Sequence, residues 1–162
     1  MGGGHGPHAP SLGHIALAWL GSLVAIGLIA FITERYDQLL LIGSFGASCV
    51  LVFGFPKSPL SQPRNLIGGH LLASFVGLTF LTLFGVHWWN TALALATLIA
   101  LMLYTRTGHP PGGANLVIIM MTQPDWRFLY DPTLIGAVII LLVGLAFNNI
   151  GRDRSYPMFW LG

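Results

Sequence analysis

The chain has 162 residues, of which 54% are hydrophobic and 7% are charged, and its mean hydropathy is +0.75. An ordinary soluble domain carries about 25% charged residues, and a soluble chain of this length has too little interior to hide so much apolar surface. The composition therefore predicts an integral membrane protein. The formal net charge of +2 is too small to predict a nucleic-acid partner.

The chain divides into a short tail and one transmembrane domain. Residues 1–14 are rich in glycine, proline and histidine, and we expect a flexible tail that is neither a signal sequence nor a metal site. The remaining apolar stretches have roughly the 20 residues that a spanning helix needs. They predict six membrane segments, near residues 15–33, 38–55, 65–85, 89–105, 108–124 and 132–150. A short C-terminal tail, 151–162, completes the single domain of residues 15–162.

The basic residues favour six crossings with both termini in the cytoplasm. In that topology one side of the membrane carries five basic residues and the other side carries two, as the positive-inside rule expects. The five are Lys57, Arg64, Arg106, Arg152 and Arg154, and the two are Arg35 and Arg127. If the fifth segment instead turned back within the membrane, the split would fall to four against three.

The fifth segment contains a stretch that interrupts a helix. It reads Gly108-His109-Pro110-Pro111-Gly112-Gly113-Ala114-Asn115. Adjacent prolines remove two N–H donors, and the glycines that follow permit close backbone approach. Non-helical backbone at membrane depth persists only where it is buried in protein or lines a wet cavity. We therefore expect a functional site here, with a helix beginning just after the break.

An internal match suggests that the chain is built from two related halves. Sliding the sequence by 67 residues places Gly46 on Gly113 and Ala47 on Ala114. The units would be residues 15–85 and 89–150, with three segments each, so the second unit is inverted relative to the first. The predicted fold is an all-α membrane protein of six segments in two inverted repeats. Its second and fifth segments are interrupted near the midplane, which is where transporters with such repeats bind substrate.

A helix that begins inside the membrane presents free backbone N–H groups and the positive end of its dipole. Two such ends that face one another would hold a small inorganic anion without a buried lysine or arginine. The predicted binding residues are Ser44, Gly46, Ala47, Ser48, His109, Gly112, Gly113, Ala114 and Asn115. The alternative for each small residue is that it only permits close helix packing.

Four other roles are expected around this site. Arg64 and Asn65, at the cytoplasmic mouth, would attract the anion or gate its passage. His70 would belong to the same gating or entry residues, and its side chain would pair with Asn148 or Asn149. His109 would gate the anion or carry a proton with it, and a purely structural histidine is the alternative.

No sequence motif predicts an enzyme, a cofactor or a metal centre. The chain contains no GxxxxGK[ST], GxSxG or HExxH motif. Two rival functions stay open: a transporter of another solute or of a metal cation that uses the histidines, and a membrane scaffold that transports nothing. Because six short helices make a thin wall around a site, we expect a homo-oligomer.

Several motifs together resemble the HPP family of integral membrane proteins. They are the histidine–proline–proline stretch, Phe45-Gly46-Ala47-Ser48, Ser58-Pro59 with Gln62-Pro63-Arg64-Asn65, Gly68-Gly69-His70 and Arg154-Ser155-Tyr156-Pro157. The resemblance implies a small-anion transporter, with nitrite first, since some plant members are described as nitrite transporters of the plastid inner envelope. The family is often described with four spanning helices, whereas the sequence predicts six segments. Without a transit peptide or an appended domain, this chain resembles a bacterial member of the inner membrane.

Overall fold

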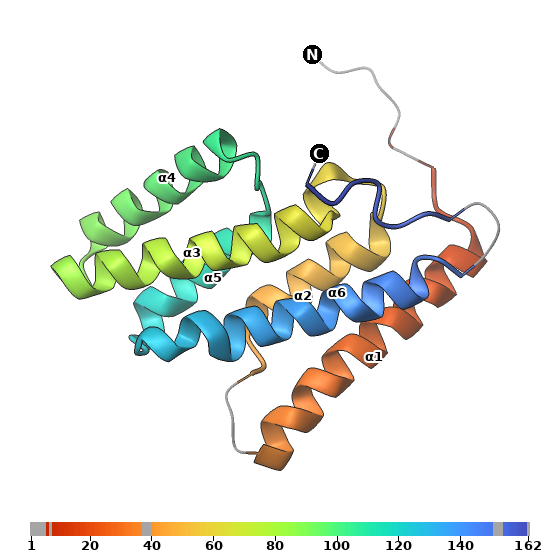
Figure 1. Ribbon diagram of the computed structural model, residues 1–162, viewed down its shortest axis with the longest axis horizontal. Coiled ribbons are helices and arrows are strands. Elements are labelled where there is room, and N and C mark those ends of the chain that lie inside the picture. The colour runs from red at the N-terminus through yellow and green to blue at the C-terminus, as the bar shows by residue number, and fades with distance from the viewer. Residues whose placement is uncertain (1–5, 7, 37–39, 151–153, 162) are drawn as a thin grey trace.

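The computed structural model describes residues 6, 8–36, 40–150 and 154–161, and within these ranges the chain is helical without strands (Figure 1). The elements in order are α1 Leu12–Tyr36, α2 Gly43–Cys49, the π-turn η1 Val50–Gly54, the short η2 Pro59–Ser61, α3 Pro63–Phe84, α4 Trp88–Tyr104, α5 Pro110–Thr122, η3 Trp126–Leu129, η4 Tyr130–Leu134 and α6 Ile135–Phe147. Each of the six apolar segments expected from the sequence therefore contains a helix.

The helices differ in whether they are long enough to cross a membrane. By length and composition, α1, α3 and the run Trp126–Phe147 qualify, whereas Gly43–Gly54 and α4 are shorter apolar helices. With 13 residues, α5 extends about 20 Å at 1.5 Å per residue, which is less than the roughly 30 Å of a hydrocarbon core. Six full crossings stay a prediction.

The two short helices α2 and α5 begin near the middle of the bundle and run toward opposite ends of it (Figure 1). The backbone enters both in an extended conformation, at Ile42 before α2 and at His109 before α5. The long helices α3 and α6 run in opposite directions beside them, and α1 and α4 flank the bundle (Figure 1). Each short helix therefore occupies about half of the bundle's length.

Two apolar clusters hold the helices together. One joins α1, α2 and α6 around Phe45, Val52 and Ile140. The other joins α3, α4 and α5 around Leu98 and Leu116. Large apolar side chains also cover much of the outside, since 33 of them are exposed among the described residues. An outer surface of this kind is stable against lipid and not against water, which agrees with the composition.

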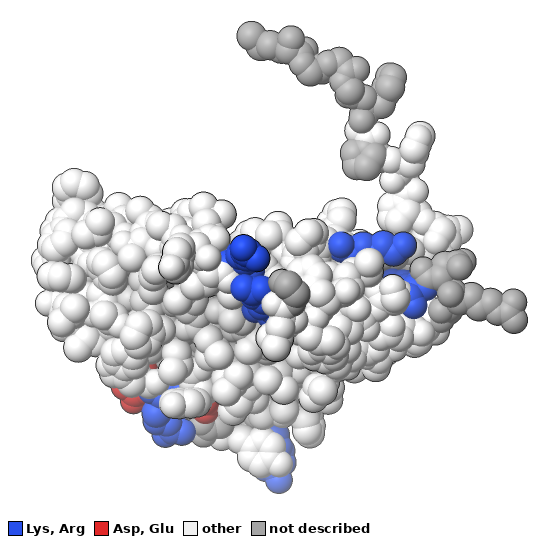
Figure 2. All heavy atoms as spheres, turned by 45° about the horizontal axis from the view of Figure 1, so that its top comes forward, with Lys and Arg blue, Asp and Glu red and all other residues white. Residues whose placement is uncertain are grey.

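The charged residues gather at opposite ends of the bundle. Arg64 near the start of α3 donates to the carbonyl of Thr105 after α4 and to that of Leu161 in the C-terminal tail, and His14 of α1 contacts the carbonyl of Gly54. These contacts bring the first turns of α1 and α3 and the last turn of η1 to one end. In Figure 2 the acidic side chains that the view shows for the described residues lie on the opposite side, beside other basic side chains. Arg152, one of the five predicted cytoplasmic basic residues, lies outside the described residues.

Candidate functional site

The first turn of α5 has almost no free N–H groups. Pro110 and Pro111 occupy its first two positions and have none, and the N–H of Gly112 donates to the carbonyl of His109 at 2.8 Å. The expected row of amides at residues 112–114 is thus used up within the helix. An anion near α5 would meet the His109 side chain instead.

α2 begins at Gly43, three residues before the expected start. The amides of Gly46 and Ala47 therefore lie inside the helix rather than at its free end. Ser44 and Ser48, which lie one turn apart, face inward, while Gly46 and Ala47 are exposed. Ala114 of α5 is exposed as well. The Gly-Ala pairs correspond at the 67-residue offset, but they do not face one another across a site.

The structure instead brings seven polar side chains together in the centre of the bundle. We call this set the polar core. It consists of Ser44 and Ser48 of α2, His70 and Ser74 of α3, His109 before α5, Asn115 of α5 and Thr133 of η4. Every one of the seven has 0% of its surface exposed. Five of them were predicted as site residues, and Ser74 and Thr133 were not.

One half of the polar core is a bridge between two histidines. The Oγ atom of Ser48 lies 2.8 Å from Nε2 of His70 and 3.0 Å from Nε2 of His109. The other ring nitrogen of His109, Nδ1, lies 2.8 Å from the carbonyl oxygen of Leu60. The two imidazole rings meet edge to face, with centroids 5.0 Å apart. The Oγ atom of Ser48 in α2 thus contacts both His70 in α3 and His109, the residue just before α5.

The expected pairing of His70 with an asparagine of the sixth segment is wrong. Asn148 donates to the carbonyl of Val52 at 2.8 Å, and Asn149 donates to that of Tyr156 at 2.7 Å. Both asparagines lie at the far end of α6, where Asn148 holds η1 and Asn149 holds the C-terminal tail. Burial also raises the pKa of the Tyr156 phenol, which donates to the carbonyl of Ser61.

The other half of the polar core is a chain of three neutral side chains. The Nδ2 atom of Asn115 donates to Oγ of Ser74 at 2.8 Å, and this hydroxyl lies 2.7 Å from Oγ1 of Thr133. Ser74 follows His70 by four residues and shares its face of α3, a spacing that could have signalled its position. Thr133 gives no such signal, because 59 residues separate it from Ser74.

Three buried atoms of the polar core have no hydrogen-bond partner among the described residues. They are Oγ of Ser44, Nδ1 of His70 and Oδ1 of Asn115. A buried polar atom without a partner costs about 1–3 kcal/mol, so proteins rarely keep several in one place without a use for them. The three side chains belong to α2, α3 and α5 and are all fully buried. They leave the polar core with unused hydrogen-bonding capacity.

Comparison with known proteins places the chain in a family. The family described as "HPP, transmembrane region" matches residues 7–157. The chain belongs to the HPP family. It is 43% identical to one transmembrane protein of Dictyostelium discoideum over 95% of its own length, and 38% identical to a second over 98%. It spans 58% and 55% of these two relatives, and neither name states a function. No solved structure matches the chain significantly.

The histidine–proline–proline motif of the HPP family lies at the start of α5. His109 is the extended residue before α5, and the two prolines form the first turn of that helix. Proline is well suited to this position, because its ring presets the helical φ angle and its missing N–H is not needed there. The motif places an imidazole at the exact point where the interrupted segment turns into a helix.

Two residues at the predicted cytoplasmic mouth of this HPP-family protein fix the chain rather than face the polar core. Arg64 uses both terminal nitrogens on backbone carbonyls, at 2.6 Å each. Asn65 donates through Nδ2 to the carbonyl of Gly108 at 2.8 Å. The link before His109 is therefore held against the start of α3. A role in attracting anions stays a prediction.

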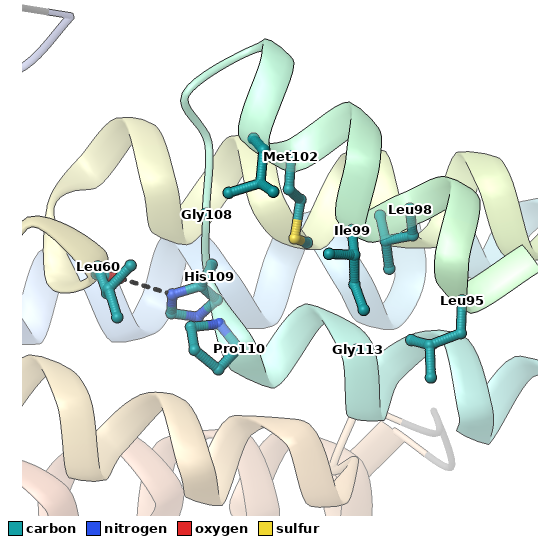
Figure 3. A pocket seen from close by; sticks show the side chains of 10 residues that line it. Leu60, Leu95, Leu98, Ile99, Met102, Gly108, His109, Pro110 and Gly113 are labelled. Atoms are coloured by element: carbon teal, nitrogen blue, oxygen red, sulfur yellow. Dashed lines mark hydrogen bonds between the residues drawn. The ribbon is translucent and has the colours of Figure 1, made fainter.

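A cavity of about 400 Å³ lies between α4 and α5, beside His109 (Figure 3). Leu98, Ile99 and Met102 extend into it from α4, and Gly113 lines it from α5 (Figure 3). Its lining is almost wholly apolar, so it offers a polar solute little besides the imidazole. Gly113, a predicted binding residue, thus faces this lateral cavity and not the polar core.

Proposed function

We propose that this chain transports a small anion across a membrane, and that nitrite is the first anion to test. The observation that carries the proposal is the polar core, which holds seven fully buried polar side chains and three unpartnered atoms at the middle of a membrane bundle. Polar groups at that depth are expensive, and in membrane proteins they mark solute pathways. Nitrite is chosen because of the resemblance of the motifs to plant HPP proteins.

The chemistry of the polar core favours an anion over a cation. None of the seven side chains is a carboxylate, and the positive end of the α2 dipole lies next to Ser44. The metal-cation alternative would need histidine lone pairs, but both Nε2 atoms face the Ser48 hydroxyl and Nδ1 of His109 faces a carbonyl. Only Nδ1 of His70 is left, and one nitrogen does not make a metal site.

The positions of the helices support two inverted repeats with the site between them. α2 begins at Gly43 and α5 begins at Pro110, which is the 67-residue offset seen in the sequence. The two helices run in opposite directions from the middle of the bundle (Figure 1). The solute would bind to the side chains of Ser44, His70 and Asn115, with Ser48 and His109 in support. The amides of residues 46–47 and 112–114 would not contact it.

The full burial of the polar core suits a transporter that alternates between two open states. With all seven side chains at 0% exposure, a solute cannot enter or leave without a movement of the helices. An open channel would instead expose part of its binding site. We place the end with Lys57, Arg64 and Arg106 in the cytoplasm, in accordance with the positive-inside rule. We also propose a bacterial inner membrane as the location and a homo-oligomer as the assembly.

Nitrite flux into liposomes that contain the purified protein tests this function. We expect uptake above that of protein-free liposomes, with competition by formate or nitrate where these share the site. Chloride has no oxygen atom to accept a hydrogen bond in the site, so it should compete less. If no small anion moves faster than in protein-free liposomes, the transporter proposal fails and the scaffold alternative gains.

A further inference from the structure

The hydrogen atoms of the histidine bridge follow from its heavy atoms. The carbonyl of Leu60 accepts only, so Nδ1 of His109 carries a hydrogen, and Nε2 of a neutral His109 then has a bare lone pair. The Ser48 hydroxyl has one hydrogen and two acceptors in reach, this lone pair at 3.0 Å and the carbonyl of Ser44 at 3.1 Å. With a neutral His109 the contact to Nε2 is a hydrogen bond only when the hydroxyl donates to Nε2. Its oxygen then accepts from Nε2 of His70, which must carry a hydrogen. In a neutral His70 the remaining nitrogen, Nδ1, is a bare acceptor.

This bare nitrogen is the unpartnered Nδ1 atom of His70. It lies in the polar core with Oγ of Ser44 and Oδ1 of Asn115, which also have no partner among the described side chains. The neutral bridge thus ends at a basic nitrogen that faces no donor. We infer that Nδ1 of His70 binds the proton that crosses the membrane together with the anion, one proton for each anion. The inference rests on the proposed transport function and adds its coupling ion.

The surroundings of His70 explain why the proton and the anion would bind together. From α2 the ring faces Ser48 and the edge of Phe45, and just before α5 it faces the ring of His109. The Asn115 amide of α5 donates to the backbone carbonyl of His70 at 3.4 Å. His109 is the titratable side chain among them. The Cys49 thiol, next to Ser48 on α2, packs in the apolar cluster, and the carboxylate of Asp131 lies two residues from Thr133 without a contact to His70 among the described bonds.

A charge on His70 would therefore have no countercharge in the polar core unless an anion is bound. An anion there would likewise have no cation unless His70 is protonated. A buried charge is strongly unfavourable alone and tolerated in a pair, so each ion raises the affinity for the other. With ring centroids 5.0 Å apart, His70 and His109 repel each other when both are charged. The pair of rings therefore takes up a single proton.

The coupled step conserves charge and protons. A proton from one side adds to Nδ1 of His70, and the anion binds to the new N–H with the Ser44 hydroxyl beside it. The core then holds a neutral pair. On the other side the anion leaves, the N–H bond of Nδ1 breaks, and His70 returns to its neutral form. No hydrogen of Ser48 or His109 has to change place.

Flux under separate pH and voltage gradients tests the inference in liposomes that contain the full chain. With nitrite as the probe and protein-free liposomes subtracted, we expect an inward proton gradient to drive accumulation of about tenfold per pH unit. A positive-inside potential without a pH gradient should drive no accumulation, because the transported pair is neutral. Accumulation that follows the voltage and ignores the pH gradient would overturn proton coupling and leave the transport function standing. No protein-dependent nitrite movement in either gradient would instead overturn the function itself.

His70→Gln provides the matched variant. Glutamine keeps an N–H for the Ser48 oxygen but cannot bind a proton. We expect it to lose accumulation under the pH gradient by tenfold or more, while His87→Gln, on the exposed turn before α4, behaves as the native chain does. A His70→Gln protein that still accumulates nitrite under the pH gradient would overturn the inference. The voltage experiment on the native chain decides the question even if the variant does not fold.

Discussion

Gly69 of α3 and Gly112 of α5 lie against each other without a side chain between them. A Cβ atom on Gly112 would be 2.9 Å from the carbonyl oxygen of Gly69, and a Cβ atom on Gly69 would be 2.5 Å from Cβ of His109. Close contact of small residues is a common way for membrane helices to pack. Here it presses the lead-in of α5 against α3 and so brings His109 within reach of Ser48 and His70.

Gly112→Ala is expected to destabilise the protein by about 1–3 kcal/mol, because the added methyl group meets backbone that cannot give way. Thermal unfolding in detergent should show a lower midpoint than for the native chain. Gly113→Ala is the control, since its Cβ would lie at an ordinary 3.6 Å from Leu95. Equal stability of the two variants would contradict the close contact between α3 and α5.

Ser44→Ala should raise the stability or leave it unchanged, and it should slow anion flux. Its hydroxyl is buried without a partner, so the methyl group removes a desolvation cost and no hydrogen bond. Ser74→Ala should instead cost about 1–3 kcal/mol, since its hydroxyl bonds to both Asn115 and Thr133. Thermal unfolding and nitrite flux on both variants separate the two roles. A Ser44→Ala protein that is clearly less stable would mean that the hydroxyl has a structural partner.

Arg64→Lys is expected to loosen the C-terminal tail. One guanidinium group reaches the carbonyls of Leu161 and Thr105 at once, and an ammonium group cannot reproduce this fork. Limited digestion with trypsin should then cut after Arg154 sooner than in the native chain. Lys57→Arg, an exposed position with the same charge, should not change the rate. Unchanged digestion of Arg64→Lys would show that the tail is held elsewhere.

Single cysteines at Lys57 and Arg127 test the topology in a Cys49→Ala background. Both positions are exposed, and they lie in the segments predicted to be cytoplasmic and external. A membrane-impermeant thiol reagent should label them from opposite sides of intact vesicles. Labelling of both from one side would contradict six crossings. The short α2 and α5 make this the most direct test, because neither is long enough to cross alone.

The sequence alone determined the class, the positions of the six helical segments and the place of the interruption. Transfer of apolar side chains into lipid depends on local composition, and proline and glycine act on the backbone where they stand. α3 and α4 accordingly begin and end within two residues of the expected 65–85 and 89–105. The family resemblance was confirmed, because it depends on the same local motifs.

Tertiary structure alone decided which side chains meet. Packing of α2 against its neighbours buries Ser44 and Ser48, which lie one turn apart on one face, and leaves Gly46 and Ala47 exposed. Ser74 and Thr133 are 59 residues apart and contact each other only because α3 and η4 pack together. The hydrogen positions in the bridge of His70, Ser48 and His109 depend on a carbonyl at Leu60, which no side-chain pattern in the sequence could reveal. Hydrogen bonds are short and directional, so the site follows from the packing of the helices and not from their order along the chain.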